Sequence, residues 1–338
     1  MPISTIPTSG LSSDQGVNFR NLIINGDMSI AQRGTSSTGI TGDGYFTVDR
    51  FKNEMSSAGT WTQSQSTDVP SGQGFANSVK YDCTTANASL SAGTYGFITQ
   101  RFEGQNLQML KFGTSSAETL TLSFWVKSNK TGTYIAEIIT FATTKSQTIS
   151  SADTWEKKTL TFTGDTATAI ANSNARSLNL VFWLVAGTNN TSGTLNTSFN
   201  TTVQANRAVG QVNLADSTSN EWYITGVQLE VGTSASDFEF VPFDVNLLRC
   251  QRYFEICEGG KQFYNATSHQ PRVNVDFKVN KRAVPSLTNI STNENCANGI
   301  QYSTGAIDGT LCARVNAVNA FVTGEKFFYG KFSADSEL

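Results

Sequence analysis

Short segments in which apolar and polar residues alternate recur along most of this chain, and turn residues separate them. In residues 120–126 the even positions are apolar, which is the period of a strand that buries one face. Many such strands, with Gly, Asn, Ser and Thr between them, favour two packed sheets, that is, an all-β sandwich. We expect its main strands at residues 74–81, 95–102, 119–127, 133–141, 155–163, 178–185 and 221–231.

The composition argues against several classes of function. Only 15% of the residues are charged, against about 25% in a typical soluble domain. The net charge of -3 disfavours a protein that neutralises nucleic-acid phosphates. No apolar run approaches the roughly 20 residues of a membrane helix, and the N-terminus lacks the basic and apolar stretches of a signal peptide. We therefore expect no nucleic acid, no membrane and no export through a signal peptide.

The length of 338 residues corresponds to about two domains. Residues 1–18 hold little apolar content and are expected to form an extended N-terminal arm. Residues 19–243 would form the sandwich. Within it we expect a short apolar strand at residues 21–26, a loop over residues 33–44 and a long loop over residues 186–220.

A second, smaller unit follows the sandwich. Apolar residues at helical spacing predict a linking helix over residues 244–258, with Asp244 as its N-cap and Gly259-Gly260 ending it. Residues 259–338 would be a small β domain, below the size that stands comfortably alone. We expect its strands at residues 272–279, 310–318 and 321–332.

Few groups in the chain suit metal binding or covalent catalysis. His269 is the one histidine, and no C-x-x-C pair occurs, so a zinc site lacks both ligands and spacing. A Ser-His-Asp triad would depend on His269, which lies in a polar turn. The odd number of cysteines predicts buried reduced thiols rather than disulfides: Cys83, Cys250, Cys257, Cys296 and Cys312.

Paired carboxylates for glycoside hydrolysis remain formally possible, although each acid is more typical of a solvated surface. The acids in question are Asp49, Asp82, Glu103, Glu137, Glu230 and Glu239. We expect no enzyme, no cofactor and no metal.

Sugar binding is the sharper hypothesis, because an indole ring offers an apolar face to sugar C–H groups. Strand alternation places Trp125 and Trp183 opposite the Leu and Phe side chains of their strands, on a second face. The alternative is that these rings fill side cores or subunit contacts. The candidate stacking residues are Trp61, Trp125, Trp183 and Trp222.

Five stretches, in this order, resemble a module of tail-fibre and other virion proteins of tailed bacteriophages. They form its opening, its closing strand and the helix that follows. The stretches are Asn21-Leu22-Ile23-Ile24-Asn25-Gly26-Asp27-Met28, Ala31-Gln32-Arg33-Gly34, Val48-Asp49-Arg50-Phe51, Trp222-Tyr223-Ile224-Thr225-Gly226-Val227-Gln228-Leu229-Glu230-Val231-Gly232, and Arg249-Cys250-Gln251-Arg252-Tyr253-Phe254.

The same module is similar to jelly-roll carbohydrate-binding modules, which also begin with Asn-Leu-x-x-Asn-Gly-Asp and carry a Trp before a middle strand, as Trp155 does here. The resemblance implies a jelly-roll fold. In such modules an acid of the opening strand and Asp residues of the last strand often hold a structural calcium. Here Asp27 keeps half of that pattern, but the last strand carries no acid at Ile224-Thr225-Gly226-Val227, so no metal is expected.

Together these features predict a jelly-roll sandwich, one short helix and a small C-terminal β domain. The resemblance implies a phage virion structural protein, a tail fibre or appendage subunit that binds host-surface glycans without catalysis. Its partners would be other virion proteins, reached through the arm, and two further copies of itself in a homotrimer. Assembly would take place in the host cytoplasm. A capsid decoration or head-fibre protein is the alternative, and a polysaccharide-degrading enzyme or its accessory domain is the alternative of another class.

Overall fold

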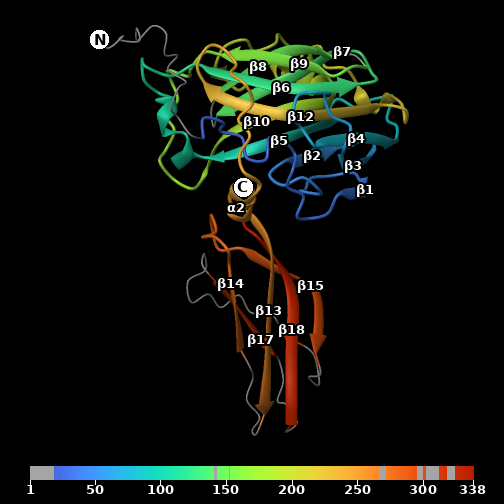
Figure 1. The fold of residues 1–338 in the computed structure, drawn as a ribbon. Coiled ribbons are helices and arrows are strands. Elements are labelled where there is room, and N and C mark those ends of the chain that lie inside the picture. Colours follow the sequence, from blue (N-terminus) through green and yellow to red (C-terminus); the bar gives the residue numbers. More distant parts are fainter. Residues whose placement is uncertain are drawn as a thin grey trace, which may run out of the picture.

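The computed structural model describes residues 19–140, 143–151, 153–265, 272–294, 300–301, 312–317 and 324–338. The predicted arm and His269 lie outside these residues. Figure 1 shows a two-sheet sandwich joined through one helix, α2, to a smaller group of strands. All strand pairs are antiparallel, and the predicted all-β fold with one linking helix and a small C-terminal β domain is confirmed. None of the helices in the described part of the chain has the length and hydropathy to cross a membrane.

The first sheet of the sandwich has β12 beside its centre. Alternate residues of β12 point inward on either side of a bulge, so that Trp222, Ile224 and Leu229 join the core. In the same sheet, Phe124 packs edge-on against Phe182 of the other sheet, with 5.0 Å between ring centroids. The strand order is β1 (Ser36–Ile40), β3 (Thr60–Ser66), β4 (Ser78–Thr85), β12 (Glu221–Val231), β6 (Leu120–Ser128) and β9 (Glu156–Phe162).

The second sheet packs its inner face on this core. Its strand order is β11 (Asn200–Thr201), β8 (Thr143–Ser151), β7 (Gly132–Thr140), β10 (Arg176–Ala186), β5 (Tyr95–Glu103) and β2 (Lys52–Ser56). The turns η2 (Gly104–Asn106) and η3 (Gln108–Leu110) follow β5, and the loop after β10 holds α1 (Thr188–Thr191), η4 (Gln204–Asn206) and η5 (Leu214–Asp216).

Residues 21–26 do not form the predicted strand. Side-chain amides replace strand hydrogen bonds here: Asn21 Oδ1 accepts from the backbone N–H groups of Ile23 and Leu229, and Asn25 Nδ2 donates to the carbonyl of Ile30 at 2.8 Å. Gly26 lies so close to the carbonyl of Val227 that an added Cβ would stand 2.1 Å from its oxygen. This opening segment is therefore irregular and is held against β12 by hydrogen bonds. Strand β1 occupies part of the predicted loop over residues 33–44.

The linking helix is shorter than predicted. Helix α2 spans Phe243–Gln251 with Pro242 as its N-cap, while Asp244 lies in its first turn. The strand β13 (Phe254–Asn265) begins three residues later, and Gly259-Gly260 pair with Gly330 and Tyr329 inside it instead of ending a helix. The apolar pattern continues past Gln251 because Tyr253 and Phe254 are buried where the two domains meet, and not because the helix continues.

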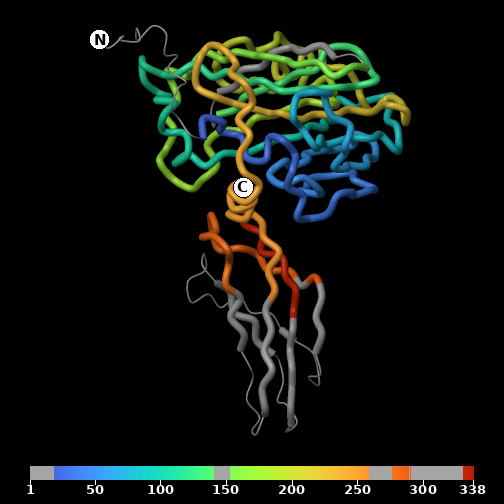
Figure 2. The backbone as a smooth tube through the Cα atoms, in the orientation of Figure 1, coloured from blue at the N-terminus to red at the C-terminus, as the bar shows by residue number. Residues whose placement is uncertain are grey.

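The C-terminal domain consists of two three-stranded sheets in the described residues. One has the order β13, β18 (Gly324–Asp335) and β15 (Ser286–Glu294). The other has the order β14 (Arg272–Asp276), β17 (Cys312–Ala317) and β16 (Ile300–Gln301). The last strand returns toward the sandwich, so that the C-terminus lies beside α2 (Figure 2).

Buried charges join the two domains. Glu103, at the end of β5, is fully buried and accepts hydrogen bonds from Arg252 at 2.7 and 2.8 Å and from the Tyr253 hydroxyl at 2.6 Å. Burial alone would raise the pKa of Glu103, but these donors hold it below its usual value. Arg50 stacks on the Tyr253 ring at 3.4 Å and pairs with Glu337 near the chain end. We call this group the joint.

The long loop after β10 covers the outer face of the second sheet. Trp183 points away from the main core, as alternation predicts, but it is only 1% exposed and packs against Phe97 at 4.9 Å between ring centroids. Its Nε1 donates to Glu137 at 3.0 Å, and Arg207 of the loop pairs with the same carboxylate. The loop therefore closes this face with a small core of its own.

Replacing Trp183 tests this cover. Trp183→Ala should lower the free energy of unfolding by about 3–5 kcal/mol, because it empties a buried aromatic site and removes a hydrogen bond to buried Glu137. Denaturant unfolding measures the change. Trp155→Ala, at a partly exposed ring, is the control and should cost much less. Equal small losses in both variants would contradict the closed face.

Asp49 should make stability depend on pH near neutrality. It is buried beside the joint and accepts a hydrogen bond from the backbone of Gln32 at 3.0 Å. Burial raises its pKa from 3.8 to about 7, with Arg33 and Gln32 opposing the shift. An acid whose pKa is higher in the folded state stabilises the fold when protonated there, so its contribution is full below pH 3.8 and lost as pH rises through 7.

Melting temperatures of the wild type and Asp49→Asn between pH 5.5 and 8.5 measure this effect. The wild type should lose stability relative to the variant as the pH rises through 7. Parallel curves for the two proteins would show that Asp49 does not titrate in this range.

Candidate functional site

The four predicted stacking residues do not lie together. Trp61 is fully buried with Nε1 donating to the carbonyl of Ala58 at 2.8 Å, and Trp222 lies in the main core 6.1 Å from Tyr81. Trp183 is covered by the loop after β10. These three rings have no face open to a sugar, so their assignment as stacking residues is corrected: they are core residues. Trp222 lies two residues before Ile224 and points inward with it, so the alternation along this strand already predicts that Trp222 is buried.

Trp125 is the exception, since it lies partly exposed on the outer face of the first sheet. It pairs across the sheet with Thr225 of β12 and with Lys157 of β9. The β12 strand has a bulge at Gly226, where an added Cβ would stand 2.5 Å from the Phe75 ring and 3.1 Å from the Trp125 ring. Glycine at this position leaves room for both rings against the sheet.

Further polar and aromatic side chains share this outer face. Tyr223 stands between Lys80 of β4 and Lys127 of β6 in the strand register, and its ring lies 6.1 Å from that of Trp155, in the turn before β9. Lys127 Nζ lies 4.5 Å from the Tyr223 ring centroid. We call the group the outer patch, and it consists of Trp125, Trp155, Tyr223, Lys80, Lys127, Asp68 and Glu221.

Hydrogen bonds fix the side chains of the outer patch. Asp68 accepts from Trp155 Nε1 at 2.9 Å and pairs with Lys127. Glu221 accepts from Lys80 at 2.5 Å and from the Tyr223 hydroxyl at 2.6 Å. Partial burial would raise the pKa values of both acids, but the lysine and ring donors hold them below their usual range. Both carboxylates are therefore ionised at neutral pH and offer acceptors beside the rings.

The outer patch combines what sugar recognition needs. Two partly exposed indoles present apolar surface, while ionised carboxylates and ammonium groups at the same level can exchange hydrogen bonds with hydroxyls. Each lysine of the patch is matched by a carboxylate. The arrangement suits an uncharged polar ligand with alternating C–H and O–H surfaces. From the sequence, Trp155 is named only through the resemblance, and Tyr223 is not named as a site residue. Strand alternation directs Tyr223 outward, because its neighbour Trp222 is buried.

Five of the six acids named for catalysis are used elsewhere, while Asp82 of β4 stands opposite Glu221 of β12 in the strand register. Glu103 and Glu137 are paired with Arg252 and Arg207. Glu230 accepts from Ser236, Glu239 from the backbone of Phe19 and Asn21, and Asp49 from Gln32. Among the described residues no group of three or more Asp, Glu, His or Cys side chains could hold a metal. Asp27 instead accepts from Asn246 of α2 at 3.2 Å. Cys83, Cys250 and Cys257 are buried free thiols.

No protein-family model matches this chain, and no curated protein matches it. Among solved structures, it is similar to the enzymatically active domain of tailspike protein 4 of bacteriophage CBA120, at 13% identity and a TM-score of 0.33. That match covers 63% of this chain and 22% of the other. It is also similar to the family 11 carbohydrate-binding module of a Clostridium thermocellum cellulase, at 10% identity and a TM-score of 0.27. Here 58% of this chain and 98% of the other are covered. A family 30 carbohydrate-binding module matches at 7% identity and a TM-score of 0.30, over 67% of this chain and 93% of the other.

Proposed function

We propose that the protein is a non-catalytic glycan-binding subunit of a tailed-phage virion, of the tail-fibre or appendage type. The outer patch is its glycan site. Glycan binding is proposed because two partly exposed indoles, Trp125 and Trp155, lie on the open face of the first sheet. The Trp155 ring is held in place by Asp68, so it is already ordered before a ligand arrives. Preorganised rings lose little conformational entropy on binding.

The patch favours an uncharged polysaccharide. Its two lysines form ion pairs with Asp68 and Glu221, so the charges of the patch are matched within it. A flat sheet face with rings spaced along it fits an extended sugar chain better than a compact metabolite, which is usually enclosed by a cleft. Host-surface glycan is therefore the proposed ligand class.

The absence of catalysis is part of the proposal. Catalysis by a carboxylate pair needs two acids on either side of a bound sugar, one with a raised pKa. In the outer patch both acids, Asp68 and Glu221, have lowered pKa values and are engaged with lysines. Five of the acids named from the sequence support the fold or the joint: Asp49, Glu103, Glu137, Glu230 and Glu239. This pattern favours binding over hydrolysis.

The virion part of the proposal is supported by the resemblance of the opening, closing and helix motifs. The arm through which the protein would attach to other virion proteins lies outside the described residues. A virion component made in the host cytoplasm should appear in fixed stoichiometry in purified particles, which quantitative mass spectrometry would measure. Its absence from particles would contradict the assignment without affecting glycan binding.

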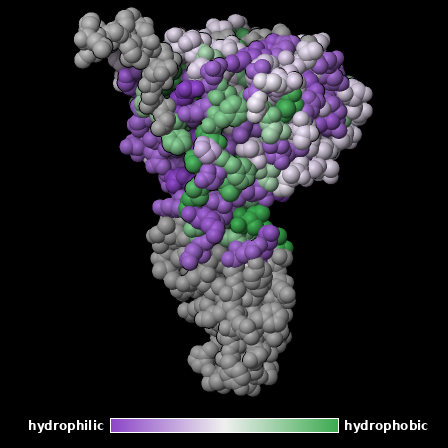
Figure 3. All heavy atoms as spheres, viewed as in Figure 1, coloured by the Kyte–Doolittle hydropathy of each residue, from purple (hydrophilic) through white to green (hydrophobic). Residues whose placement is uncertain are grey.

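Exposed hydrophobic side chains support self-association, which we propose to be a homotrimer. On the face shown in Figure 3 they gather in a band that runs from the sandwich toward the C-terminal domain. Large hydrophobic residues exposed around α2 are Phe240 at 52%, Phe243 at 63%, Leu248 at 44% and Val284 at 61%. Apolar surface of this kind is typical of an interface with another chain.

The glycan site is tested by alanine substitution of its two indoles. Trp155→Ala and Trp125→Ala should each weaken binding to the glycan found on an array by about tenfold or more, equivalent to ~1.4 kcal/mol. Val203→Ala, at an exposed position in the loop that covers the second sheet, is the control and should bind normally. Unchanged affinity in both tryptophan variants would remove the outer patch as the site. Release of reducing ends during the assay would contradict the non-catalytic part.

The oligomer is tested by light scattering. The wild type should run near three times its chain mass of 36.5 kDa. The double variant Phe240→Ser, Phe243→Ser should dissociate at micromolar concentration, because it removes apolar contacts of the band. Val203→Ser, at an exposed hydrophobic residue in the loop after β10, should leave the mass unchanged. A monomeric wild type would reject the trimer.

A further inference from the structure

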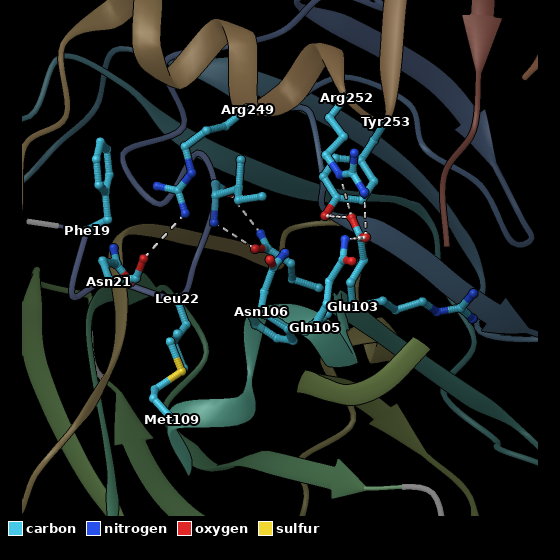
Figure 4. A pocket seen from close by; sticks show the side chains of 14 residues that line it. Phe19, Asn21, Leu22, Glu103, Gln105, Asn106, Met109, Arg249, Arg252 and Tyr253 are labelled. Atoms are coloured by element: carbon cyan, nitrogen blue, oxygen red, sulfur yellow. Dashed lines mark hydrogen bonds and ion pairs between the residues drawn. The ribbon is translucent and has the colours of Figure 1, made fainter. Parts of the chain in front are cut away.

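A cavity lies at the joint and shares no lining residue with the outer patch. Its volume is about 510 Å³, within the ordinary range of small-ligand sites. Three elements form its walls: the opening segment after Phe19, the end of β5 with η2, and helix α2. Figure 4 shows Arg249 and Arg252 entering it from α2, with Phe19 on one side and Met109 opposite α2.

Arg249 differs from the other arginines of this cavity. Arg252 is paired with Glu103, and Arg101 with Glu54. The guanidinium of Arg249 has only a long contact to the carbonyl of Asn21, at 3.5 Å, and a position 5.8 Å from the Phe19 ring. No carboxylate of the described residues lies within ion-pair distance of it.

This unmatched charge is costly where it stands. Burial lowers the pKa of Arg249, with Glu239 and other groups opposing the shift. A partly desolvated cation without a partner is unfavourable, and an anion that entered the cavity would relieve that cost. Glu103 and Glu54 neutralise Arg252 and Arg101, so the positive charge that remains in the cavity is that of Arg249.

The remaining lining groups indicate what else the anion would carry. Phe19 and Met109 are 54% and 50% exposed, and they give the rim an apolar surface. The Asn106 side chain is exposed beside them and offers both a donor and an acceptor. A ligand that uses the whole site therefore has one anionic group, an apolar ring face and hydroxyls.

From this juxtaposition we propose that the cavity binds an acidic saccharide through its carboxylate, with Arg249 as the anion-binding residue. The planar guanidinium matches a carboxylate with two parallel hydrogen bonds. The sugar ring would lie against Phe19, and its hydroxyls would reach Asn106. This site is distinct from the outer patch, whose two lysines are ion-paired, and its ligand differs from the neutral glycan proposed there.

Calorimetric titration of the full chain with four probes tests the site: D-glucuronate, D-glucose, glucose 6-phosphate and acetate. Glucuronate should bind at least tenfold more tightly than glucose or acetate, because only it supplies both the carboxylate and the ring. Arg249→Gln should weaken glucuronate binding at least tenfold, and Arg249→Lys should weaken it less. Phe19→Ala, at an exposed ring, should weaken it without affecting folding. Lys331→Gln removes a distant exposed charge and should have no effect.

Each of three contrary results would contradict a different part of this proposal or replace it. Equal binding of acetate and glucuronate would exclude a saccharide, and tighter binding of glucose 6-phosphate would replace the carboxylate by a phosphate. Unchanged glucuronate affinity in Arg249→Gln and Phe19→Ala would overturn the site itself. Trp155→Ala should leave glucuronate binding intact, so that failure of the outer patch and failure of this cavity are told apart.

Discussion

The buried carboxylate of Glu103 is the contact on which the arrangement of the two domains depends. It ends β5 and receives Arg252 and Tyr253 from residues about 150 positions later in the chain. Burying an ion pair costs desolvation free energy unless further hydrogen bonds satisfy it, and here the tyrosine hydroxyl and Gln105 do so. Truncation of one partner would leave the other charge buried and unmatched. These contacts form only when α2 docks in this position, so the joint fixes the position of α2.

The two outer faces of the sandwich differ in exposure because of one loop. The residues after β10 fold back over the second sheet, and Arg207 closes on Glu137 beside Trp183. On the first sheet, the rings of Trp125 and Trp155 stay partly exposed. Availability for a ligand is thus set by loop placement, since both sheets carry tryptophan on their outward side.

The strands with clean alternation could be predicted from the sequence, and β12 was located at its observed bounds. The pattern missed β3, because Gln63 points inward and is satisfied by Thr47 and Tyr81 instead of being apolar. Side-chain partners of this kind are far apart in the chain and leave no local signal. The same limit applies to the site: alternation predicted the side of Trp183 correctly, but the loop that buries it is a tertiary feature. Trp155 lies in a turn, where no period gives its direction.

The position of the cavity has a thermodynamic consequence. Its walls include both β5 and α2, and Arg252, which lines it, is itself part of the joint. A ligand that binds only when these walls are together stabilises the docked arrangement by mass action. The outer patch has no such connection, because all its residues belong to the sandwich. Occupation of the cavity would therefore bear on how firmly the C-terminal domain is held, whereas occupation of the patch would not.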